Sequence, residues 1–160
     1  MTYATSDEVL RFLRIARVRG ERIDLSGANL RELNLQMFDL SGANLRRADL
    51  RGANLRGANL RGVDLRSAQM AEASLDGASL YKADLSMADL WKISFICADL
   101  YWADLSLANL IGADLRGANL YETNLWRADL RGANLFGAKL YNVDFREAKV
   151  DRVILCDADL

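Results

Sequence analysis

The sequence predicts an all-β domain in which the chain winds as a square coil, preceded by a short α-helix. Three observations predict this fold. A large apolar residue occurs at every fifth position from Leu25 to Leu160. Ten of the eleven glycines share one position of that five-residue repeat. Tyrosine recurs every 20 residues, at Tyr81, Tyr101, Tyr121 and Tyr141. Together they indicate a chain that turns a corner in every repeat.

The helix is expected over residues 5–19, and residues 1–20 are expected to cap the first coil. Thr5 and Glu8 fit a capping box, Ser6 is an alternative N-cap, and Gly20 fits a helix stop. A cap is favoured because a coil exposes its apolar core at an open end, while a basic membrane-surface helix is the alternative. The apolar face would consist of Val9, Leu10, Phe12, Leu13 and Ala16, with Arg11, Arg14 and Arg17 opposite.

The period of five fits neither common element. Leucine occupies 24 of the 28 central positions, and alanine stands two residues earlier in 20 of the 28 repeats. An α-helix would turn each five-residue step by about 140°, which spreads these leucines around all sides. A long strand would send successive leucines to opposite faces. Leucine and alanine can all face one axis only if the chain bends at each repeat.

The residues between the leucines fit such corners. The shared glycine position is two after the central residue, as in Gly42 and Gly52, and glycine tolerates the positive φ that tight turns require. Bulkier residues occupy that position in other repeats, so glycine is favoured there but not obligatory. Asp or Asn usually precedes the leucine and can bond to nearby backbone. No proline is present to remove an N–H needed between coils.

The number of repeats in one circuit follows from the outward residues. Because tyrosines 20 residues apart would stack on one face, four repeats should close a circuit. The repeats then make about seven coils, in a tower roughly 30 Å tall at the ordinary spacing between strands.

This pattern resembles the pentapeptide-repeat family, whose motif is written A(D/N)LXX. Ala43-Asn44-Leu45, Ala48-Asp49-Leu50 and Ala53-Asn54-Leu55 carry it, and the resemblance covers residues 21–160. It implies a right-handed quadrilateral β-helix. Relatives include cyanobacterial proteins and bacterial proteins that protect DNA gyrase from quinolones. The resemblance therefore points to a bacterial protein, and especially to a cyanobacterial one.

Composition argues against several functions. The 160 residues carry a net charge of −1 and include no histidine. Imidazole catalysis and histidine-ligated metals are thereby excluded, and no carboxylates are expected to converge in a cleft. We therefore expect no enzyme, metal or cofactor. No signal-peptide pattern or membrane-spanning apolar run is present. The expected location is the cytoplasm, with Cys97 and Cys156 reduced and too far apart for a disulfide.

Two outward groups are candidates for binding a partner. The tyrosine column (Tyr81, Tyr101, Tyr121 and Tyr141) either stabilises the coils by stacking or, with Trp102, forms an aromatic platform for a partner protein. The second group is a set of outward apolar residues in the middle coils, called here the apolar girdle. Contiguous exposed apolar side chains often mark partner sites. The girdle comprises Met87, Trp91, Ile96, Cys97, Tyr101, Trp102, Leu107 and Ile111.

Charged residues suggest two alternatives to protein binding. Arginines concentrate in the second and third coils, where interleaved carboxylates such as Asp49 favour a salt-bridged wall over phosphate binding. Asp64, Asp84, Asp104 and Asp144 follow one side of the tower, as a DNA mimic acting on gyrase would require. Seventeen arginines oppose that interpretation, and nucleic acid is not an expected partner.

The repeat continues to Asp159-Leu160 with no cap after it. An end-to-end homodimer through this last coil is the favoured arrangement. A longer natural chain and a bare end are the alternatives. The sequence thus predicts a non-catalytic, rigid scaffold for protein–protein interaction. Its partner is an unidentified protein, and no membrane is involved.

Overall fold

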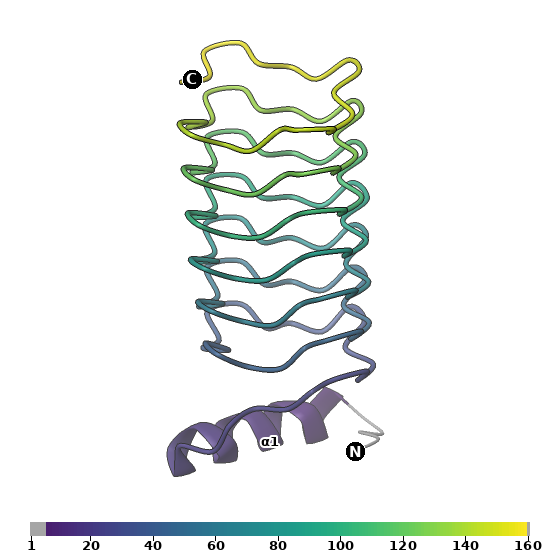
Figure 1. The fold of residues 1–160 in the computed structure, drawn as a ribbon. Coiled ribbons are helices and arrows are strands. Elements are labelled where there is room, and N and C mark those ends of the chain that lie inside the picture. Colours follow the sequence, from purple (N-terminus) through teal and green to yellow (C-terminus); the bar gives the residue numbers. More distant parts are fainter. Residues whose placement is uncertain (1–5, 160) are drawn as a thin grey trace.

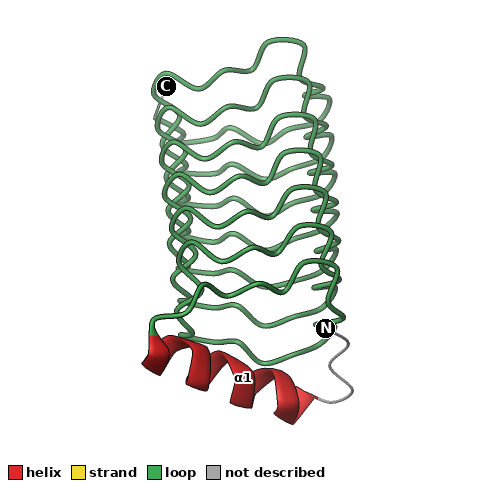
Figure 2. Cartoon of the chain, turned by 60° about the horizontal axis from the view of Figure 1, so that its bottom comes forward, coloured by secondary structure: helices red, strands yellow, loops and turns green. Residues whose placement is uncertain are grey.

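The computed structural model describes residues 6–159, which form one α-helix and a tower of stacked circuits (Figure 1). Helix α1 spans Ser6–Arg19 and lies across the lower end of the tower (Figure 2). The predicted helix is therefore confirmed, although Thr5 of the expected capping box lies outside the described residues. Within residues 6–159 no helix is long and apolar enough to cross a membrane.

The end of α1 is set by Gly20, as its sequence predicts. Gly20 has a φ of +64°, its N–H donates to Arg17 O at 3.2 Å, and the N–H of Glu21 donates to Ala16 O at 2.9 Å. This pair of bonds is the Schellman arrangement, which satisfies carbonyls left open at a helix end. The chain then enters the first coil directly.

The circuits pair through isolated parallel bridges, each joining residues 20 apart, from Asp24↔Asn44 to Lys139↔Asp159. The N–H of Leu45 donates upward to Asp64 O at 2.8 Å, and the N–H of Asn44 donates downward to Ile23 O at 2.9 Å. The predicted circuit of four repeats is therefore confirmed. No extended strand occurs in the described part of the chain, because each side contributes one bridge residue between two corners.

Each corner places one residue in the left-handed region. Gly27 has a φ of +66°, and Ala28 N–H closes the turn on Leu25 O at 3.0 Å. Within residues 6–159, seventeen non-glycine residues, such as Glu32 and Met87, adopt the same conformation. The corner role of glycine is confirmed, and so is the expectation that other residues can replace it.

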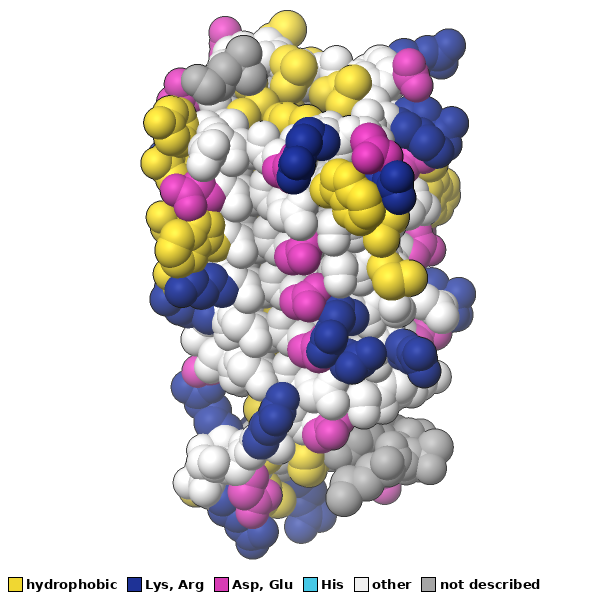
Figure 3. Space-filling model, viewed as in Figure 1, with side chains coloured by type: hydrophobic (Ala, Val, Ile, Leu, Met, Phe, Trp, Pro, Cys, Tyr) yellow, Lys and Arg dark blue, Asp and Glu magenta, His cyan; other side chains and the backbone are white. Residues whose placement is uncertain are grey.

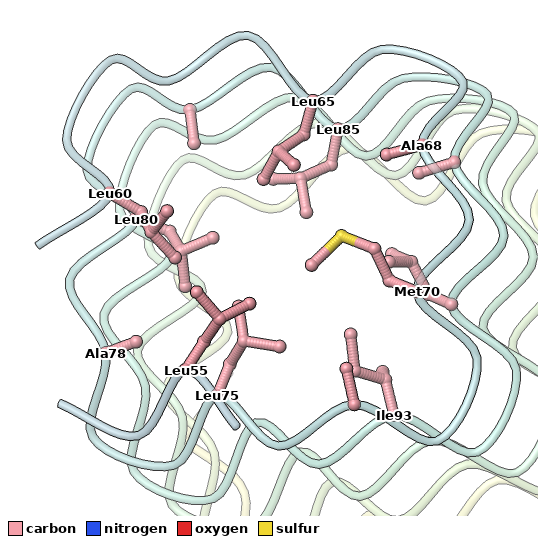
Figure 4. Close-up of a cluster of buried hydrophobic side chains, with 14 of the residues drawn as sticks. Leu55, Leu60, Leu65, Ala68, Met70, Leu75, Ala78, Leu80, Leu85 and Ile93 are labelled. Carbon is pink, nitrogen blue, oxygen red and sulfur yellow. The ribbon is translucent and has the colours of Figure 1, made fainter. Parts of the chain in front are cut away.

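The interior is filled by the central leucines and the alanines that precede them (Figure 4). Leu55 and Leu75 lie one above the other, as do Leu60 and Leu80, and the side chain of Met70 points into the same space. Five larger residues at alanine positions are also buried, whereas three others are half-buried: Phe38, Val143 and Val153. Among the buried ones, Thr123 donates its hydroxyl to Leu100 O at 2.8 Å, so its polar group is satisfied.

The central apolar residues of the repeats are buried up to Leu140, and those described in the last coil are half-buried or exposed to solvent. Leu140 is buried, whereas Phe145 is half-buried, and Val150 and Leu155 are exposed. At the opposite end, Val9, Leu13 and Ala16 of α1 are buried against the first coil. The two ends of the tower therefore differ: one is covered by a helix, and the other presents its apolar interior.

Candidate protein-interaction surface

The outward side chains of the tower stand in vertical columns at its four corners. Two consecutive residues of each repeat form a corner, and the residues above them follow 20 positions later, as the bridges require. The predicted tyrosine column occupies one corner. The girdle residues occupy all four corners in the middle coils, so they surround the tower and do not form a single flat patch.

The tyrosine column is a continuous series of ring contacts. Ring centroids lie 5.5 Å apart between Tyr81 and Tyr101, 5.2 Å between Tyr101 and Tyr121, and 4.9 Å between Tyr121 and Tyr141. Burial is the main cause that raises the pKa of Tyr101 above its ordinary value. Such contacts add to the stability of neighbouring coils, beyond the area that they bury.

Neighbouring rings and cations cover most of the column, although Tyr141 at its upper end is 56% exposed. Tyr121 and Tyr141 are stacked, with 22° between their planes, and at the lower end Arg61 lies 4.4 Å above the ring of Tyr81. Lys82 contacts the Trp102 ring at 4.5 Å, and the Trp102 indole N–H donates to the carboxylate of Glu122. This arrangement favours the stabilising role of the column over stacking of nucleic-acid bases, which needs free ring faces.

The girdle contains several exposed apolar side chains. Met87 is 62% exposed and Leu107 is 46% exposed. They occupy equivalent positions in adjacent coils, since their numbers differ by 20. Trp91 and Trp102 are also exposed, whereas Ile96 and Ile111 are half-buried. The girdle thus offers short vertical pairs of apolar side chains at separate corners.

Two further aromatic side chains belong with this surface, and the sequence interpretation omitted both. Trp126 is half-buried in the coil above Leu107, and its backbone carbonyl accepts the Leu107 N–H at 2.9 Å. Phe136 is exposed two coils above Ile96. Figure 3 shows hydrophobic side chains grouped at one corner of the visible face and along its edge. Both residues occupy the repeat position that follows the central leucine, which is the signal that could have identified them.

Three arginines of the lower coils pair with carboxylates: Arg51, Arg56 and Arg66. Arg51 pairs with Asp49 and Arg66 with Asp64, each at 2.5 Å within one repeat. These side-chain hydrogen bonds are the main cause that lowers the pKa of Asp49 and of Asp64. Arg46 and Arg47 form no ion pair with any described residue. The geometry therefore shows a salt-bridged wall around Arg51, Arg56 and Arg66 but not around Arg46 and Arg47.

The acidic column is partly neutralised. Asp64 and Asp84 are bridge neighbours, and Arg66, the partner of Asp64, also approaches Asp84 to 3.5 Å. Arg146 pairs with Asp144 at 2.8 Å, and its side-chain hydrogen bond is the main cause that lowers the pKa of Asp144 to about 2. The column therefore presents less negative charge than its carboxylates alone would.

The two cysteines are free and exposed. Among the residues that the structure describes, no group of three or more Cys, Asp or Glu side chains could hold a metal ion.

The repeats were then compared with known proteins. The family model described as pentapeptide repeats matches residues 23–62, 58–92, 73–112 and 98–137. These matches span well over half of the chain, which therefore belongs to the pentapeptide-repeat family. Proteins of this family fold as right-handed quadrilateral β-helices. The comparison with curated proteins gives no match.

Similar solved structures include two cyanobacterial proteins and one resistance protein. HetL from Nostoc sp. strain PCC 7120, involved in heterocyst differentiation regulation, is 28% identical with a TM-score of 0.43, covering 100% of this chain and 95% of HetL. Alr5209 from Nostoc PCC 7120 is 33% identical with a TM-score of 0.32, and the match covers 84% of this chain and 93% of Alr5209. Full-length QnrB1, a plasmid-mediated fluoroquinolone resistance protein, is 22% identical with a TM-score of 0.32. The match covers 81% of this chain and 84% of QnrB1.

Proposed function

We propose that this protein is a non-catalytic, rigid scaffold that binds a partner protein through the apolar girdle of its middle coils. The observation that carries the proposal is the exposure of Met87 and Leu107, one above the other, on a wall whose backbone is fixed by bonds between coils. A pre-formed surface binds with little ordering cost, and exposed apolar side chains supply the favourable burial. The tyrosine column would contribute mainly by holding the wall in place.

The proposal includes an architecture and a location. The tower would comprise about seven coils over residues 21–160, residues 1–20 would form its cap, and the protein would act in the cytoplasm. A second copy of the chain would cover the exposed last coil. Val150 and Leu155 are exposed in the single chain, and this exposure supports the proposal that a second copy covers them.

The girdle can be tested without disturbing the fold. Met87 and Leu107 both have a φ of 60°, so glycine at these positions removes the apolar side chain and relieves a left-handed conformation. We expect that Met87→Gly/Leu107→Gly loses a partner captured by the wild type from an extract of the source organism, and that the variant melts no lower than the wild type.

Met37→Gly is the matched control, because Met37 is exposed with a φ of 61° but lies in the first coil. It should retain the partner. Equal loss of the partner from the control and the double variant, or full retention by the double variant, would contradict the role of the girdle.

DNA mimicry is the second candidate, favoured by the stacked carboxylates of Asp64, Asp84 and Asp104. Because Arg66 engages two of them, we expect no inhibition of DNA supercoiling by gyrase. Inhibition that is weakened in Asp84→Asn would support mimicry and displace the scaffold proposal.

A further inference from the structure

We propose that copies of this chain associate head to tail, with the outward face of α1 from one copy seated on the open last coil of the next. The inference rests on the proposed self-association and specifies its geometry. Both contact surfaces lie at the ends of the tower, so the copies would stack along its axis (Figure 1).

The last coil presents an apolar surface of the kind that is buried elsewhere in the tower. Val150 is 51% exposed and Leu155 is 47% exposed, whereas Leu130 and Leu135, one coil below, are fully buried. The N–H of Leu130 donates to Lys149 O at 2.8 Å. The equivalent N–H groups of Val150 and Leu155 donate to no other residue in the described part of the chain. This end therefore has an apolar centre and an open hydrogen-bonding edge.

The chain already covers one end of its own tower with a helix. Val9, Leu13 and Ala16 of α1 cover the first coil, and Arg17 donates to the backbone carbonyl of Asp39 at 3.4 Å. The downward N–H groups of the first coil, such as that of Asn29, donate to no described residue. A helix therefore closes an end of this tower without pairing every backbone group on its edge.

The opposite face of α1 is available for a second contact of this kind. Val18 is 89% exposed and Ile15 is 40% exposed. Arg14 and Arg19 lie beside them around a shallow apolar hollow. Helix α1 lies across the lower end of the tower (Figure 2). Because its buried residues contact the first coil, the face with the exposed Val18 and Ile15 lies on the side away from the tower. In the stack, one helix would lie between the first coil of its own copy and the last coil of another.

Charge selects this arrangement over a tail-to-tail dimer. Helix α1 carries four arginines against two carboxylates, whereas residues 141–160 carry five carboxylates against three cations. A head-to-tail contact joins surfaces of opposite net charge, while a tail-to-tail contact places two acidic rims together, which is unfavourable. A contact between two different surfaces does not close on itself, so assembly should continue as concentration rises.

Two variants block one end each and leave the rest of the tower unchanged. Val18→Asp places a charge on the outward face of α1, and Leu155→Asp places one at the centre of the last coil. Sedimentation velocity over a concentration series measures the assembly. The wild type should grow beyond a dimer, whereas each variant alone should remain at the 17.8 kDa of one chain. An equimolar mixture of the two variants should form a dimer and stop there.

Other outcomes separate this inference from the proposals on which it rests. A wild type that stops at a dimer, with Val18→Asp still dimeric and Leu155→Asp monomeric, would establish tail-to-tail association and overturn the head-to-tail geometry. A wild type that is monomeric throughout would overturn self-association, while the girdle proposal would still be decided by its own capture experiment. Met87→Gly/Leu107→Gly should assemble like the wild type. Circular dichroism of every variant establishes that it is folded.

Discussion

The corner residue two positions after each central residue has a positive φ throughout the tower, whether or not it is glycine. A left-handed conformation costs a non-glycine residue about 1–2 kcal/mol. The tower imposes it because the N–H of this residue donates to the coil above, as from Arg47 to Arg66 O at 3.0 Å. Bonds repeated in each coil below the last thus offset a local cost at many positions.

This cost can be measured at two neighbouring residues. Arg47 has a φ of 55°, whereas Arg46 is not among the positive-φ residues, and neither side chain forms an ion pair with a described residue. We expect Arg47→Gly to raise the free energy of unfolding by about 0.5–1 kcal/mol, since relief of the left-handed conformation exceeds the entropic cost of glycine. Arg46→Gly should lower it. Urea denaturation checks both, and the same sign for the two variants would refute this account of the corner.

Among the elements, α1 is held to the tower by packing and by one carboxylate near the corner of the first coil. Asp39 pairs with Arg17 of the helix. Partial burial alone would raise the pKa of Asp39. The hydrogen bonds from Ser41 and Arg17 outweigh this effect, and the pKa falls from an ordinary value of 3.8 to about 2. Ionised Asp39 therefore stabilises the docked helix.

This interaction predicts an acid-sensitive contribution. A carboxyl whose pKa is lowered by folding stabilises the fold above its unfolded pKa, and the contribution disappears as the pH falls through the folded pKa. The melting temperature should therefore fall between about pH 4 and about pH 2. Asp39→Asn removes this titration. Its amide oxygen can still accept the hydrogen bond that Asn59 Nδ2 donates to Asp39 Oδ1 at 3.1 Å.

The Asp39→Asn variant should lose less of its melting temperature over that range than the wild type. A comparison at pH 6, outside the titration range, provides the reference for each protein. An equal loss in both would show that Asp39 does not contribute to the acid sensitivity.

The elements also show how far the sequence could predict the molecule. The helix, the inward leucines and the 20-residue circuit follow from it, because burial imposes a strict period on residues such as Leu55 and Leu75. The ion-pair partners of the outward side chains cannot be predicted from the sequence. Arg51 reaches a carboxylate in its own repeat, whereas Arg56 crosses to Asp76 at 3.0 Å in the coil above. A long flexible side chain can reach either kind of neighbour.

The candidate site was predictable only in part for a similar reason. Sequence position places Met87 and Leu107 at a corner, but their exposure depends on what the coils above and below present. Trp126 is difficult to predict as part of this surface because the upper coils contain fewer outward apolar residues. Its Arg127 neighbour lies 4.5 Å from the ring, a contact that depends on the corner geometry.

For the whole molecule, only insertions or deletions of a full 20-residue circuit keep each outward side chain in its own column. Deleting residues 61–80 removes a full circuit and keeps every remaining column aligned. Deleting residues 61–65 removes one repeat, keeps leucines inside, and moves every column above the deletion by one corner relative to the columns below it. We expect the smaller deletion to have the lower melting temperature. The opposite order would show that column alignment adds little to stability.

Each coil offers the next the same edge of backbone donors and acceptors. An in-frame duplication of one circuit would therefore lengthen the tower without a new interface or a new kind of core. Evolution can in this way change the distance between the two ends of the protein in regular steps. The surface of the inserted segment would be free to acquire a different specificity, while the older walls keep theirs.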